Sequence, residues 1–192
     1  MGELLWIIEM SKIRRINFFG PPCSGKDTAA SYVFSKMKID GYNVKFVNEY
    51  VKQWTYIDRN PKAWDQVYLS GKQLQLEHTA LESGFDYIVS PSPLLLTGYY
   101  GMRLECKVRD HILGIFKAFE EEYPSLHIFL DNSEIEYDEI ARFQTKAQSD
   151  EIGAELLIFL SKEIGDFHVV DSTDLDKIYE IVKGNVNKLP NI

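Results

Sequence analysis

The stretch FFGPPCSGKDTAA, residues 18–30, reads as an apolar strand that runs into a glycine-containing turn and then into a helix. Within it, Gly20, Gly25 and Lys26 satisfy the pattern GxxxxGK. In such a loop the glycines let backbone N–H groups point at phosphate oxygens, and the lysine reaches the β and γ phosphates. Because the pattern follows a strand and opens a helix, we predict a nucleotide-binding loop rather than an ordinary turn. The predicted loop comprises Gly20, Pro21, Pro22, Cys23, Ser24, Gly25, Lys26, Asp27 and Thr28.

Asp27 stands where such a loop usually has the serine or threonine that binds Mg²⁺. A carboxylate beside a triphosphate is repelled unless the metal lies between them, directly or through water. Asp27 is therefore either a metal-binding residue or a first-turn acid favoured by the helix dipole. Thr28 can still offer a hydroxyl to phosphate, and we interpret Cys23 as a small loop residue rather than a nucleophile.

The composition is typical of one globular domain, with 192 residues, 45% of them hydrophobic and 26% charged. No stretch approaches the roughly 18 consecutive apolar residues of a membrane-spanning helix, and the first ten residues contain Glu3 and Glu9 but no basic segment. We therefore expect a cytoplasmic protein without a membrane partner. We interpret residues 1–12 as an N-terminal extension, with Met1 or Met10 as the start, and 13–192 as a single domain.

The net charge and the cysteine content limit which binding partners, disulfides and metal sites can be expected. A formal net charge of -8 argues against a large nucleic-acid footprint, although a local basic patch stays open. Cys23 and Cys106 cannot form a disulfide framework, and neither lies in a pattern spaced for zinc. The four histidines also lack ligand spacing, so we expect no structural metal.

Apolar runs alternate with segments of helical periodicity along the chain. The expected strands are 13–19, 43–49, 85–90, 126–130 and 167–170, and helical faces occur within 27–38, 64–81, 104–119, 152–160 and 175–182. This alternation predicts an α/β fold with a five-stranded, mostly parallel sheet and helices on both faces. Ligands bind at the carboxyl ends of such strands, so the loops near Gly20, Glu49, Pro91, Asp131 and Asp171 are the expected site.

The segment GPPCSGKDT is also similar to the phosphate loops of adenylate-kinase-like nucleoside and nucleotide kinases. Its part GKDT resembles the same loop in bacteriophage deoxynucleoside monophosphate kinases. The segment NEYVKQW, 48–54, resembles the Glu-x-Val-x-x-Trp segment of deoxynucleoside kinases, whose glutamate acts as base on the acceptor hydroxyl. The resemblance covers roughly 16–182. It implies a P-loop kinase fold, ATP and Mg²⁺ as cofactors, and Glu49 as a catalytic base.

Two further segments carry the resemblance. IVSPSPLLL, 88–96, resembles the third-strand segment of small phage and NadR-type kinases, which commonly has an aspartate where this chain has Pro91. ARFQTKAQSDE, 141–151, resembles a lid segment whose arginine closes on the transferring phosphate, which implies a lid near 132–148 and a catalytic role for Arg142. A solvated loop is the alternative for this segment.

Phosphoryl transfer requires positive charge around the phosphate and an oriented acceptor. Lys26, Glu49 and Arg142 are the predicted catalytic residues; the alternative for Glu49 is a surface acid or a partner of Lys52. Predicted substrate-binding residues are Trp54, Arg103 and Arg109, and for Trp54 packing in the core is the stronger alternative.

The acceptor stays open between a nucleoside, a nucleotide and DNA. Some phage enzymes of similar build phosphorylate 5-hydroxymethyluracil within DNA, and 56–64 with 103–110 could supply basic contacts. A nucleotide-hydrolysing switch is a third hypothesis, but it predicts an acid where Pro91 stands. The sequence does not decide whether the protein is a homodimer, and a bacteriophage origin would place it in the host cytoplasm.

Overall fold

The architecture comes from a computed structural model, which describes residues 13–131 and 145–186. Its strands are β1 (Arg15–Phe19), β2 (Val44–Phe46), β3 (Tyr87–Ser90), β4 (Ser125–Asp131) and β5 (His168–Asp171). They form one sheet in the order β2-β3-β1-β4-β5, and every neighbouring pair is parallel. The predicted five-stranded parallel sheet is therefore confirmed.

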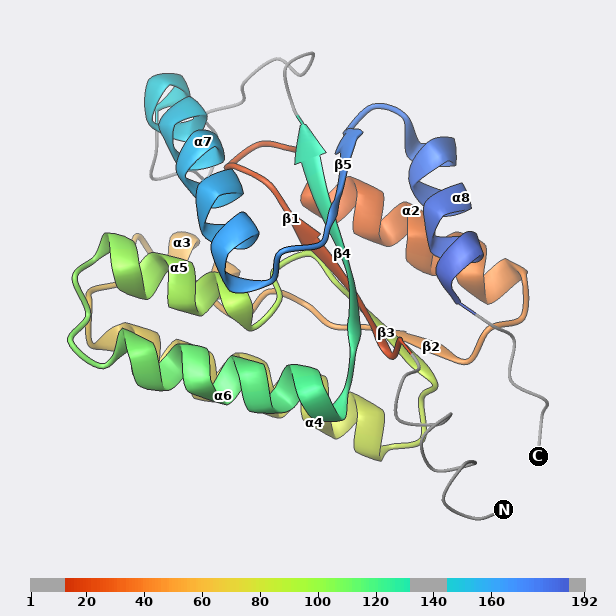
Figure 1. Cartoon of the computed structure of the whole chain (residues 1–192), viewed down its shortest axis with the longest axis horizontal. Coiled ribbons are helices and arrows are strands. Elements are labelled where there is room, and N and C mark those ends of the chain that lie inside the picture. The colour runs from red at the N-terminus through yellow and green to blue at the C-terminus, as the bar shows by residue number, and fades with distance from the viewer. Residues whose placement is uncertain (1–12, 132–144, 187–192) are drawn as a thin grey trace.

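Helices cover both faces of this sheet (Figure 1). The helices are α2 (Lys26–Ile39), α3 (Lys52–Thr55), α4 (Asp65–Glu82), α5 (Leu95–Arg103), α6 (Arg109–Glu122), α7 (Lys146–Glu163) and α8 (Leu175–Asn185). Strand β1 is buried along its whole length, with Ile16 and Phe18 in the core under α2 and α8 and Phe19 in the core under α4–α7. This alternation is the period of a strand buried on both faces.

The segment 104–119, predicted as one helical face, is divided in the structure. Helix α5 ends at Arg103 with Leu104 as its cap, and Glu105 adopts a left-handed conformation with φ of 54°. The Cys106 N–H donates to the Gly101 carbonyl at 2.8 Å, so the chain reverses before α6 begins. The prediction of one helical face over 104–119 was wrong, because an apolar residue at helical spacing, such as Leu104, does not indicate whether the backbone is broken before the next residue of the pattern.

The predicted N-terminal extension, 1–12, lies outside the described residues, as does most of the predicted lid. Residues 145–148 of that lid begin α7, where Thr145 and Gln148 form a capping box. None of the helices in 13–131 and 145–186 is long and apolar enough to span a bilayer.

Candidate active site

The phosphate loop joins β1 to α2 through three residues with positive φ: Gly20 at 151°, Cys23 at 63° and Gly25 at 73°. A Cβ on Gly20 would overlap the Ser24 hydroxyl and lie 3.0 Å from the Leu130 carbonyl oxygen. Gly20 therefore satisfies both a backbone conformation and a close approach that only glycine permits. The loop has the form that the sequence pattern predicts.

Lys26 lies at the first turn of α2 and folds its side chain over this loop. Its Nζ donates to the carbonyl oxygens of Gly20 at 2.9 Å and Pro21 at 2.8 Å, and lies 3.4 Å from the Ser24 hydroxyl. The ammonium group is thus placed at the loop centre, where a phosphate chain would be held.

Helix α7 packs against the outside of the same loop. The Ser149 hydroxyl donates to the Pro22 carbonyl at 2.7 Å. A Cβ on Gly153 would lie 3.3 Å from Pro21 Cγ, so the helix approaches the proline ring closely. The loop is consequently supported from a segment more than a hundred residues away in the chain.

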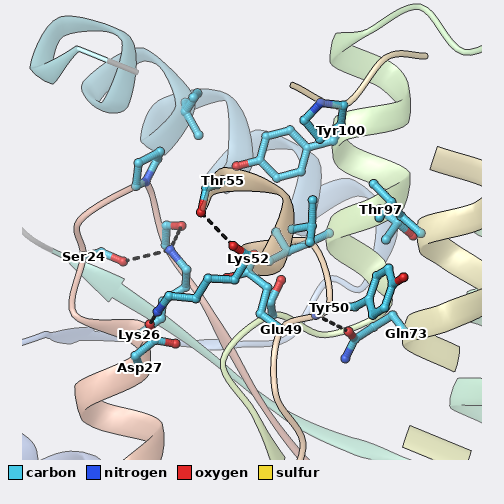
Figure 2. A pocket seen from close by; sticks show the side chains of 18 of the residues that line it. Ser24, Lys26, Asp27, Glu49, Tyr50, Lys52, Thr55, Gln73, Thr97 and Tyr100 are labelled. Atoms are coloured by element: carbon cyan, nitrogen blue, oxygen red, sulfur yellow. Dashed lines mark hydrogen bonds and ion pairs between the residues drawn. The ribbon is translucent and has the colours of Figure 1, made fainter. Parts of the chain in front are cut away.

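A cavity of about 540 Å³ opens beside the loop. Figure 2 shows Lys26 and Asp27 on one side of it, Glu49 in the middle, and Gln73, Thr97 and Tyr100 on the other side. The lining that comes from α4 and α5 is uncharged apart from Arg103, and it consists otherwise of Gln66, Leu69, Gln73, Leu96, Thr97 and Tyr100, with Leu104 directly after α5. Parallel strands bring the loops after β1, β2 and β3 to this one edge.

Glu49 follows β2 and is half-buried at the cavity. Burial raises the pKa of Glu49, while the charges of Lys26 and Lys52 and a hydrogen bond from Ser92 lower it, and Asp27 raises it further. Burial and the negative charge of Glu49 also raise the pKa of Tyr100. A carboxyl group with a raised pKa that faces the phosphate-loop lysine has the properties of a proton acceptor.

Asp27 forms an ion pair with Lys52 of α3 across the cavity wall. Partial desolvation lowers the pKa of Lys52, but the contact with Asp27 outweighs it and the net pKa is raised. Both side chains are more than a third exposed, at 47% for Asp27 and 34% for Lys52. An ion pair this accessible contributes little to folding.

The loop fits a magnesium ion that is bound mainly through phosphate oxygens. Asp27 offers a carboxylate and Thr28 a hydroxyl at the cavity. Groups of three or more potential metal-binding side chains are absent from the described ranges 13–131 and 145–186. Mg²⁺ bound with a nucleotide needs only one or two carboxylates, so Asp27 is the side chain that would hold it, directly or through water.

The other predicted site residues differ in whether they line the cavity. Arg103 lines the cavity, where Glu151 at 2.9 Å and Glu155 hold its guanidinium group. Trp54 is buried outside the lining, stacked against Tyr68 with the Arg59 guanidinium 3.6 Å above its ring, which is the packing role. Arg109 also lies outside the lining and contacts Asp110 at 3.3 Å. Arg142 falls outside the described residues.

Several lining residues were not predicted from the sequence, among them Gln66, Gln73, Ser92, Thr97 and Tyr100. One signal could have found part of this set: Gln66, Ser70, Gln73 and Glu77 recur at helical spacing, and all four are buried. A polar stripe on the buried face of a helix indicates a site or a hydrogen-bond network.

Comparisons with known proteins agree with this geometry at the level of the fold. The sequence matches no protein-family model and none of the curated proteins compared with it. It is similar in structure to the NadR protein in complex with NR, with a TM-score of 0.68 and 14% identity over 96% of this chain and 56% of that chain. It is also similar to thymidylate kinase from Ehrlichia chaffeensis, with a TM-score of 0.57 and 16% identity over 90% and 98%.

This chain therefore spans a little over half of the NadR chain and nearly all of the thymidylate kinase. At these identities the likeness concerns the fold. The predicted α/β fold with a five-stranded parallel sheet and helices on both faces is confirmed, and it is the fold that these two structures share.

Proposed function

We propose that this protein transfers the γ-phosphate of Mg-ATP to a hydroxyl group of an uncharged acceptor of the nucleoside class. The observation that carries the proposal is the position of Glu49, which shares one cavity with Lys26 and lies between it and a wall that is uncharged apart from Arg103 (Figure 2). A P-loop kinase fold with a proton acceptor at this place suits transfer to a hydroxyl rather than hydrolysis.

In this proposal ATP lies on the phosphate loop, with Lys26 against the β and γ phosphates. The acceptor oxygen forms the new bond to the γ phosphorus, its proton passes to Glu49, and the bond to ADP breaks. Glu49 must be ionised for this step, and Lys26 and the Ser92 hydrogen bond favour that form. Magnesium, when bound with ATP, neutralises phosphate charge.

The charges of the cavity favour a hydroxyl acceptor over a monophosphate. Its cationic lining residues among the described positions are Lys26, Lys52 and Arg103. Lys52 pairs with Asp27, and Arg103 pairs with two glutamates. A monophosphate is already anionic and would need arginines that face it more than it would need a base.

The alternatives have less support. Of the basic residues that could contact DNA, Arg59, Arg103 and Arg109 form ion pairs within the chain. DNA as acceptor stays a prediction. For a hydrolytic switch, the described turn after β3 brings Ser92, not an acid, to the cavity.

The test is transfer from γ-labelled ATP into separate pools of nucleosides, their 5′-deoxy analogues, nucleoside monophosphates, and DNA containing 5-hydroxymethyluracil. We expect label in nucleosides, and the 5′-deoxy analogues show whether the 5′-hydroxyl is the one that accepts it. Label only in monophosphates or only in DNA would refute the proposed acceptor class.

Two variants then assign the roles. Glu49→Gln should lower kcat by about 10²- to 10⁴-fold and leave the KM for ATP nearly unchanged, because general base catalysis contributes about that factor. Lys26→Ala should lose turnover together with ATP affinity. A Glu49→Gln variant with the wild-type rate would show that Glu49 is not the base.

A further inference from the structure

A charged cluster formed by β1, α4 and α6 contributes no residue to the lining of the cavity. Arg15 of β1 and Glu77 of α4 are both fully buried, with Arg15 Nη1 3.1 Å from Glu77 Oε2. Arg15 also pairs with Glu120 of α6, and its guanidinium group lies 4.4 Å from the centre of the Phe119 ring. Glu77 is not needed to neutralise Arg15, since Glu120 is already there.

The other carboxylate oxygen of Glu77, Oε1, accepts hydrogen bonds from two groups other than Arg15. Oε1 accepts hydrogen bonds from the Leu94 N–H at 2.9 Å and from Gln73 Nε2 at 3.1 Å. Leu94 lies two residues after Ser92 in the turn that follows β3, and the Ser92 side chain lowers the pKa of Glu49 as a hydrogen-bonding neighbour. Gln73 in turn accepts a long hydrogen bond, 3.5 Å, from the N–H of Tyr50, the residue after Glu49.

Leu94, two residues after Ser92, and Gln73, which bonds the backbone of Tyr50, therefore donate to the same oxygen atom of Glu77. The groups that face the Glu77 carboxylate are all donors, so its ionised form is the one that satisfies them. Burial raises the pKa of Glu77, and Arg15 together with these hydrogen bonds opposes that rise. The carboxylate also fixes the Gln73 amide, because only its nitrogen end can face Glu77, which turns the oxygen toward Tyr50.

We propose that Glu77 is a positioning residue that holds Glu49 at the cavity through Ser92 on one side and Gln73 on the other. This inference rests on the proposed role of Glu49 as base. It explains why a carboxylate with no contact to the cavity is buried beside it, and it assigns a catalytic consequence to the polar stripe of α4.

Glu77→Met tests this, and Glu120→Met is the matched control. Each variant removes one carboxylate partner of Arg15, but only Glu77 accepts hydrogen bonds from Leu94 and Gln73. We expect Glu77→Met to lower kcat by roughly 10- to 100-fold at a nearly unchanged KM for ATP, as expected for a displaced catalytic group. Glu120→Met should lose thermal stability yet keep kcat within about twofold.

A second readout needs no turnover. The side-chain carboxyl of Glu49, followed by ¹³C NMR, should titrate at a higher pH in Glu77→Met than in the wild type, because the Ser92 bond to the ionised form is loosened. It should titrate unchanged in Glu120→Met. If Glu77→Met does not fold, Glu77→Gln takes its place with a smaller change in the same direction.

An unchanged titration in the Glu77 variant, or an equal change in the Glu120 variant, would overturn the inference. So would a shifted titration with an unchanged kcat. If no acceptor is phosphorylated at all, the proposed function fails, and the NMR titration still decides whether Glu77 holds Glu49.

Discussion

Replacing Gly20 with alanine should destabilise the fold and disable the phosphate loop. The new Cβ would overlap the Ser24 hydroxyl and come within 3.0 Å of the Leu130 carbonyl, which belongs to β4 and cannot move without disturbing the sheet. Overpacking of this kind costs about 1–3 kcal/mol. A non-glycine residue at the observed φ of 151° adds a further 1–3 kcal/mol or so of backbone strain.

The expected loss of unfolding free energy is therefore roughly 2–6 kcal/mol, the sum of these two contributions. Gly41→Ala is the control, because Gly41 also has a positive φ, 82°, but a Cβ there would meet no atom within 4 Å. That variant should lose only the strain contribution, about 1–3 kcal/mol, and should bind ATP normally. Urea unfolding measures both free energies, and titration with ATP measures affinity. Equal losses in the two variants would refute the steric argument.

Two further predictions concern the charges of the site. If Asp27 holds the metal, Asp27→Asn should raise the Mg²⁺ concentration needed for half-maximal rate by about tenfold. The unfolding free energy should change by less than about 1 kcal/mol, because the ion pair of Asp27 is accessible to solvent. An unchanged Mg²⁺ dependence would leave Asp27 only its interaction with the helix dipole. The rate of transfer should fall with decreasing pH through the raised pKa of Glu49, because the base acts in its ionised form, so the acidic limb of the profile should lie above the usual range of a glutamate. A profile with its limb at the ordinary glutamate pKa would show that burial does not control this group.

The phosphate loop and the sheet could be predicted because their causes are local. A glycine pattern between a strand and a helix fixes the loop, and alternation of apolar runs with helical periodicity fixes the parallel sheet. The place of Glu49 could be predicted for the same reason, since a residue shortly after a strand of a parallel sheet lies near the carboxyl edge, although β2 ends at Phe46 rather than at Glu49.

The cavity lining that comes from α4 and α5 could not be predicted in this way. Helix α5 follows Pro91 and Pro93, and its short apolar sequence does not tell which residues face a cavity. The orientation of the Trp54 side chain depends on its contacts with Tyr68 and Arg59, and that of Arg109 on its contact with Asp110. A sequence motif does not contain these contacts. The role of Glu77 depends on hydrogen bonds between three separate elements.

In the proposed reaction, helix α7 would connect the sites of the two substrates. At its start Ser149 and Gly153 lie against the phosphate loop, and the same 18-residue helix carries Glu151 and Glu155, which hold Arg103 at the acceptor end of the cavity. A shift of the loop when ATP binds would therefore be transmitted through one rigid element to α5. Binding of the two substrates should then be cooperative. Thermodynamic reciprocity requires that ATP change the affinity for the acceptor by the same factor as the acceptor changes the affinity for ATP.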